Sequence, residues 1–103
     1  MSRPIDVEVS DIARAQIVAA GRWWRVNRPR APNAIREELE RASSLISFQP
    51  GIGALARNLS LAGVRRLHLA RVRYDLYYRV VDDLRRVETL SFWHAHRGGP
   101  PLL

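Results

Sequence analysis

The sequence predicts an α+β fold in which a two-helix hairpin covers one face of a single β-sheet. Apolar residues recur at helical spacing in the first half of the chain and alternate with polar residues in three runs of the second half. The connections between these runs are short, which is typical of antiparallel neighbours. With 103 residues, 47% of them hydrophobic, the chain has the size of a single domain spanning residues 1–103.

A strand and a helix open the predicted fold. Residues 5–9 alternate like a strand, and Ser10 has the side chain of an N-cap for the helix that follows. Two adjacent apolar stripes run along this helix. They are Ile12, Ala15, Ala19, Trp23 and Val26, and then Ala13, Ile17, Ala20 and Trp24. Because both tryptophans continue these stripes, we expect them in the core and not on a platform for stacking bases.

A second helix is predicted after the two prolines of residues 27–32. It begins near Asn33 and ends at residues 49–51. Its buried side is marked by Ile35, Leu39, Ala42 and Ile46. Two helices that are joined by a short turn and are apolar on one side should form a hairpin on a flat surface.

The flat surface is an antiparallel meander that follows a connecting loop at residues 51–63. Its strands are expected at Val64–Arg71, Tyr74–Val81 and Arg86–His94, with a tight turn at Asp82 and Asp83. The tail after His94 has no periodicity. Together with the first strand, the meander should form one sheet.

The middle strand has two different sides. Tyr74, Leu76, Tyr78 and Val80 lie on one side, and Asp75, Tyr77, Arg79 and Val81 lie on the other. The hairpin should cover the first side, which gives an expected core of Trp23, Trp24, Ile35, Leu39, Ile46, Leu76, Tyr78, Leu90 and Phe92. No element remains to cover the second side, so we expect it to face solvent or a partner.

The composition of the chain narrows the range of functions that it can have. The chain has no cysteine, so neither a disulfide nor a thiolate metal site is expected. No apolar run approaches the ~20 residues of a membrane span, and the N-terminus lacks a signal-peptide core, so we expect a cytoplasmic protein without a membrane partner. Lys plus Arg number 17 against 10 acids, a net charge of +7. A small basic domain most often binds nucleic acid or an acidic protein.

Four segments then occur in a characteristic order: "VEVSDIARAQI", "LISFQPGIG", "VRRLHLARVRYDLYYRV" and "VETLSFWHAHRGGPPL". Together they resemble the RelE/ParE superfamily of toxins from type II toxin–antitoxin systems, over roughly residues 5 to 102. The resemblance implies the fold derived above. It also implies a growth inhibitor held in a hetero-oligomer by a small antitoxin. RelE-like members cut messenger RNA on the ribosome, whereas ParE-like members inhibit DNA gyrase and lack the nuclease residues.

Some residues at the nuclease positions match the RelE-like branch, and others depart from it. Metal-independent RNA cleavage needs a base, an acid and cations at one phosphate. The RelE-like candidates for these roles are Arg66, His68, His96 and Arg97. However, Asp75 stands where RelE-like nucleases have an arginine, and its carboxylate would repel phosphate. The tail "GGPPLL" also lacks the tyrosine that the resemblance leads one to expect.

We therefore favour the ParE-like branch, with DNA gyrase as target and with no enzymatic activity, cofactor or metal. The alternatives are a ribosome-dependent endoribonuclease and an inactive binding module. Arg and Tyr are enriched at binding hot spots. The candidate contacts to target or antitoxin are Arg65, Arg66, Arg71, Arg73, Tyr77, Arg79, His94 and Arg97. An acidic antitoxin segment is expected to cover part of the Arg-rich sheet side and the tail.

Overall fold

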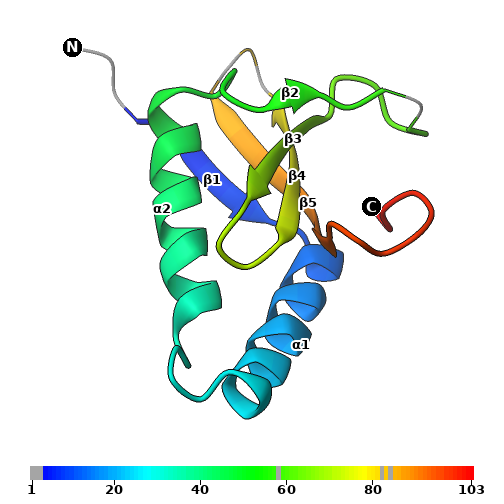
Figure 1. Ribbon diagram of the computed structural model, residues 1–103. Helices are drawn as coiled ribbons and strands as arrows, with labels where there is room; N and C mark the ends of the chain where they lie inside the picture. Colours follow the sequence, from blue (N-terminus) through cyan, green and yellow to red (C-terminus); the bar gives the residue numbers. More distant parts are fainter. Residues whose placement is uncertain (1–3, 58, 82, 84) are drawn as a thin grey trace.

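A computed structural model describes residues 4–57, 59–81, 83 and 85–103 of the chain. The elements are β1 (Asp6–Val9), α1 (Asp11–Asn27), α2 (Ala34–Phe48), β2 (Ala54–Leu55), β3 (Arg65–Leu69), β4 (Tyr74–Val81) and β5 (Arg86–His94). The predicted α+β class is confirmed. Figure 1 shows the α1–α2 hairpin beside one sheet, with β2 at the end of the molecule far from α1. No helix in the described ranges has the length and apolar character that crossing a membrane requires.

The sheet has the strand order β1-β5-β4-β3-β2. The predicted meander is confirmed, because β3, β4 and β5 pair antiparallel in sequence order, while β1 adds to the far side of β5 as a parallel strand. The predicted loop at 51–63 contains the two-residue strand β2, which pairs with Arg65 and Arg66. Of the two residues in the predicted turn, Asp83 has a φ of +52° and Asp82 lies outside the described residues.

Helix α1 follows β1 in the chain and lies beside β5, past the point where β1 stops pairing with that strand. The strand pairing ends at Val9, opposite Thr89. Beyond that point Ser10 caps α1, because its Oγ accepts from the Ala13 N–H at 3.1 Å and also donates to the Leu90 carbonyl at 3.3 Å. Six residues after Ser10, the Gln16 Oε1 accepts from the Phe92 N–H at 2.7 Å. Side chains of α1 thus satisfy backbone groups of β5 that β1 is too short to reach.

The main core lies between the hairpin and the sheet, as predicted. Five of the expected core residues are at most 3% exposed: Ile35, Ile46, Leu76, Tyr78 and Phe92. Trp24 and Leu39 are half-buried and pack against this cluster.

The assignment of Leu90 to this core was wrong. A β-bulge shifts the register between β4 and β5, so that Tyr77 faces Ser91 and Tyr78 faces Thr89. Leu90 is left without a partner in the register and packs with Val64 and Tyr77 in a second cluster.

The expectation that the second sheet face is uncovered was also wrong for the part of that face around Tyr77. The loop before β3 folds back over it with Ala56, Leu59 and Leu61, and Leu103 of the C-terminal tail joins them. Tyr77 is consequently only 7% exposed. Apolar side chains in segments without periodicity can cover a sheet as well as a helix does, because the hydrophobic effect is not directional.

Trp23 is a further correction, because its side chain is 49% exposed and does not join the core. Of the two apolar stripes on α1, only the one with Ala13 and Ala20 turns toward the sheet. These small residues let the helix approach the sheet closely. The neighbouring stripe, which lies about 100° around the helix, is left facing solvent.

Candidate functional site

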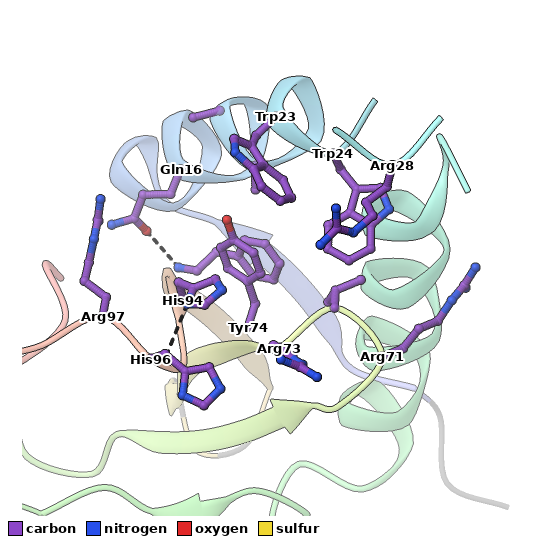
Figure 2. Close-up of a pocket in the computed structure, with 14 residues that line it drawn as sticks. Gln16, Trp23, Trp24, Arg28, Arg71, Arg73, Tyr74, His94, His96 and Arg97 are labelled. Carbon is purple, nitrogen blue, oxygen red and sulfur yellow. Dashed lines mark hydrogen bonds between the residues drawn. The ribbon is translucent and has the colours of Figure 1, made fainter. Parts of the chain in front are cut away.

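A cleft of about 850 Å³ opens between α1 and the neighbouring ends of β4 and β5. Figure 2 shows its walls. Helix α1 contributes Gln16, Trp23 and Trp24, the β3–β4 turn contributes Arg71 and Arg73, and the strands and tail contribute Tyr74, His94, His96 and Arg97.

The floor of the cleft is aromatic. The rings of Tyr74 and Phe92 stack with centroids 4.5 Å apart and planes 5° from parallel. The His94 ring meets the edge of Tyr74 at 5.1 Å. The His94 Nδ1 accepts from the His96 backbone N–H at 3.2 Å, so a neutral His94 carries its proton on Nε2. Burial raises the pKa of the Tyr74 phenol, and the positive charge of Arg97 opposes that rise.

The rim of the cleft is cationic. The Arg28 guanidinium lies 5.4 Å from the centre of the Trp23 ring, and the Arg97 guanidinium lies 4.4 Å from that of Trp93. Arg73 has a φ of +61°, and its carbonyl accepts from the Ala95 N–H at 2.9 Å. This contact ties the turn to the end of β5 and holds the Arg73 backbone in the sparsely populated left-handed region.

The residues that line the cleft carry an excess of positive charge. Of its rim cations, Arg71 is paired, at 3.1 Å to Glu37 and 3.7 Å to Glu38. No acidic residue is among the lining residues, within the part of the chain that the structure describes. Nor do any three His, Cys, Asp or Glu side chains of the described ranges gather where they could hold a metal ion. The cleft is suited to bind an anionic group over an apolar floor.

The structure brings together some of the residues predicted from sequence and separates others. Arg71, Arg73, His94, His96 and Arg97 all line the cleft. The remaining candidates lie elsewhere on the sheet and do not line it. They are Arg65, Arg66, His68, Tyr77 and Arg79.

Three of these outlying residues are engaged within the protein. Arg65 donates to the Gly53 carbonyl at 2.7 Å, and Arg79 pairs with Glu88 at 3.4 Å. Tyr77 is buried in the second cluster, which corrects the expectation that its ring forms part of an open surface.

His68 and Asp75 form a pair of their own. The His68 Nδ1 lies 2.8 Å from the Asp75 Oδ1, and Asp75 is 9% exposed. The carboxylate therefore faces a histidine of the neighbouring strand, whereas the sequence led us to expect a free charge among arginines.

Trp23, Arg28 and Gln16 line the cleft but were missed as candidates. Trp23 had been assigned to the core, since periodicity alone does not distinguish a buried stripe from its neighbour. One signal was present: no acidic residue occurs from Ile12 to Arg36, although this stretch holds several arginines. A helix that has an apolar stripe and, beyond its first residue Asp11, only positive charge indicates a binding surface more than a solvated one.

Comparison with known proteins identifies the family. Residues 7–98 match the family model described as the ParE toxin of the type II toxin–antitoxin system parDE. None of the curated proteins matches the sequence.

Solved structures with the same fold include the chromosomal ParDE toxin–antitoxin system of P. aeruginosa, with a TM-score of 0.71 and 21% identity over 92% of this chain and 100% of that one. The RelBE2 toxin–antitoxin complex of Mycobacterium tuberculosis follows, with a TM-score of 0.62 and 26% identity over 88% of this chain and 98% of that one. A doubly substituted mutant of E. coli toxin RelE in the free state has a TM-score of 0.56 and 19% identity over 90% of this chain and 85% of that one. With the family model matched over most of its length, the chain belongs to the ParE toxin family of type II toxin–antitoxin systems.

Proposed function

We propose that this ParE-family toxin inhibits growth by binding DNA gyrase, without cutting nucleic acid, and that a cognate antitoxin neutralises it by binding. Membership of the ParE family supports the target. Two of the similar structures, ParDE and RelBE2, are toxin–antitoxin systems, which supports an antitoxin partner.

The observation that carries this proposal is the separation of the two histidines that could serve as acid and base, His68 and His96. His68 pairs with Asp75 in the register of β3 and β4, on the same side of the sheet as Tyr77. His96 lines the cleft on the other side, beside His94 and the stacked Tyr74. A base and an acid must reach one phosphate to cleave RNA. Groups on opposite faces of a sheet do not meet that condition, whereas both can contribute to binding surfaces.

One observation favours an endoribonuclease as a second candidate. Asp75 holds the His68 ring through Nδ1, and the His68 side chain is 53% exposed. An imidazole oriented by a carboxylate can act as a general base through its other nitrogen. Arg66 lies two residues away on the same side of β3 and could contact a phosphate.

Two assays run side by side test the proposal: supercoiling by purified gyrase with added toxin, and cleavage of messenger RNA on programmed ribosomes. We expect loss of supercoiling and intact RNA. The variant His68→Ala should inhibit gyrase as well as the wild type does. RNA cuts with unaffected supercoiling, abolished by His68→Ala, would establish the nuclease. Inactivity of the wild type in both assays would instead favour an inactive binding module.

A further inference from the structure

The positive charge of the chain is concentrated at one end of the helical hairpin. Residues 22–36 hold five of the 17 arginines and none of the 10 acids, so they supply +5 of the net charge of +7. This stretch, which we call the hairpin tip, runs from the end of α1 through the connection to the first turn of α2. Figure 1 shows it projecting beyond the sheet, at the end of the molecule far from β2. The arginines of the hairpin tip are Arg22, Arg25, Arg28, Arg30 and Arg36.

These five arginines are exposed and little of their charge is neutralised within the chain. Among the described residues, Arg22, Arg25 and Arg30 have no carboxylate within ion-pair distance. Arg36 lies 4.0 Å from Glu40, but the two side chains are 68% and 73% exposed, and such a surface pair contributes little. The charge of the hairpin tip is therefore available to a partner.

The backbone of the hairpin tip is ordered without a partner. The Arg28 N–H donates to the Trp24 carbonyl at 2.7 Å, and the Ala31 N–H donates to the Arg28 carbonyl at 3.0 Å. Pro29 and Pro32 fix the φ angle at two further positions of the connection. Because the arginines are carried by a backbone that already has one shape, binding loses less conformational entropy than it would in a flexible basic segment.

From this distribution of charge we infer that the hairpin tip binds duplex DNA through its phosphate backbone, without reading the base sequence. A guanidinium offers two parallel N–H groups to a phosphate. Each phosphate that is neutralised releases counterions, which drives the binding. The choice of DNA rests on the proposed function, because a toxin bound to gyrase lies next to the duplex that this enzyme holds.

Other occupants fit the hairpin tip less well. An acidic protein would need apolar anchors at the centre of its interface. Among residues 22–36, all of which the structure describes, Val26 is the one exposed large aliphatic side chain. Single-stranded nucleic acid would stack its bases on exposed aromatic rings. The hairpin tip offers only Trp23 for this, and the Arg28 guanidinium already lies over that ring. A duplex requires neither feature, because its charge lies on the outside.

The inference is tested by titrating a fluorescent DNA duplex with the purified toxin, in the absence of gyrase and across a range of salt concentrations. The double variant Arg25→Ala/Arg30→Ala removes two cations from the hairpin tip. Its matched control, Arg57→Ala/Arg85→Ala, removes the same charge at two exposed arginines elsewhere. Circular dichroism verifies that each protein is folded. A second duplex of unrelated sequence, the single strand and an RNA duplex are titrated in parallel.

We expect the wild type to bind both DNA duplexes alike and to bind the single strand more weakly. The logarithm of its binding constant should fall with the logarithm of the salt concentration with a slope of about −4.5, if each of the five arginines contacts one phosphate. The tip variant should have a slope less steep by about 1.8 and should bind roughly sixtyfold more weakly at about 0.1 M salt, since two contacts are lost. The control should keep the slope of the wild type.

Equal losses in the tip variant and the control would overturn the inference, because they would trace binding to net charge alone. Absence of binding to DNA, tighter binding to the single strand, or binding to the RNA duplex alone would overturn it as well. The supercoiling assay separates this result from the proposed function. A toxin that inhibits gyrase but does not bind DNA retains its target and loses this site. A toxin that binds DNA through the hairpin tip but leaves supercoiling unchanged retains the site and loses gyrase as its target.

Discussion

At the scale of single residues, Tyr78 joins the segment after α2 to the centre of the sheet. Its ring is fully buried, and its hydroxyl donates to the Pro50 carbonyl at 2.8 Å and accepts from the Gly53 N–H at 2.9 Å. These two bonds satisfy backbone groups that a turn without regular structure would otherwise leave unpaired. The path of the chain from α2 to β2 therefore depends on one phenol.

Gly53 packs too closely against this phenol to carry a side chain. A Cβ there would lie 2.8 Å from the Tyr78 hydroxyl oxygen and 3.0 Å from the Arg66 carbonyl oxygen. We expect Gly53→Ala to destabilise the fold by about 1–3 kcal/mol, because the Arg66 backbone is held in the sheet and cannot move aside. Denaturant unfolding measures the change. Gly51→Ala is the control, since a Cβ at Gly51 meets nothing within 4 Å. Equal losses at both glycines would contradict this account.

Ionisation of the same phenol should make the free energy of unfolding depend on pH in the alkaline range. Burial raises the pKa of Tyr78, against the smaller opposing effects of its bond from Gly53 and the charge of Arg65. Because the unfolded tyrosine ionises first, its contribution to stability is complete below the ordinary pKa of about 10. That contribution is lost as the pH rises through the higher folded pKa. We expect the free energy of unfolding to fall above that ordinary pKa.

The variant Tyr78→Phe separates this effect from other titrations. It should lose about 1–3 kcal/mol at neutral pH, since the Gly53 N–H is left without its acceptor. Its stability should then depend less on alkaline pH than that of the wild type. The remaining dependence includes Tyr74, whose pKa is also raised by burial. Unfolding curves of both proteins across the alkaline range make the comparison, and identical pH profiles would rule out Tyr78 as the cause.

At the scale of elements, the junction of α1 with β5 depends on one amide side chain. The Gln16 Oε1 accepts from the Phe92 N–H at 2.7 Å and from the Ser91 hydroxyl at 3.1 Å. Its Nε2 donates to the Leu102 carbonyl at 3.3 Å. A single residue of α1 thus connects the helix both to the sheet, at the bulged part of β5, and to the C-terminal tail.

Replacing Gln16 by Leu should weaken this junction. The Phe92 N–H would lose its acceptor where the sheet packs against α1, which we expect to cost about 1–3 kcal/mol. Gln49→Leu serves as the control, because Gln49 is exposed at the end of α2. Thermal unfolding of both variants provides the measurement. A Gln16→Leu protein as stable as the control would mean that water replaces the amide at no cost.

At the scale of the whole molecule, the sheet has a core on each face. Strands β4 and β5 occupy inner positions of the sheet, with the main cluster on the hairpin side and the cluster of Val64, Tyr77 and Leu90 on the other. The edge strand β2 has only two residues, both exposed. Stability should therefore be distributed unevenly, from the centre of the sheet outward.

Hydrogen exchange can measure this distribution. We expect the amides of β4 and β5 to exchange most slowly, near the rate set by global unfolding, and those of β2 and the tail to exchange fastest. The tail should slow if a partner covers the neighbouring cleft. Uniform protection across the sheet would contradict the expectation and would indicate that β2 opens only when the whole protein unfolds.

The sequence by itself determined the class of fold, the meander and most of the main core. The alternation of apolar and polar residues in strands and their spacing in helices depend on backbone geometry, so both can be recognised without knowledge of tertiary contacts. It also supplied the residues of the β3–β4 turn and the end of β5 that line the cleft, because basic and aromatic types stand out at strand ends. The ParE family followed from motifs in order, and the family model confirms it.

Only the tertiary structure decided which surfaces are open. Periodicity gave α1 two equivalent apolar stripes, and packing against the sheet chose the one with the small residues, which left Trp23 exposed. The second face of the sheet was expected to be open, yet a loop and the tail cover part of it and bury Tyr77. A bulge moved Leu90 from one core to the other. Each outcome depends on contacts between segments distant in the chain, and a local pattern carries no information about those contacts.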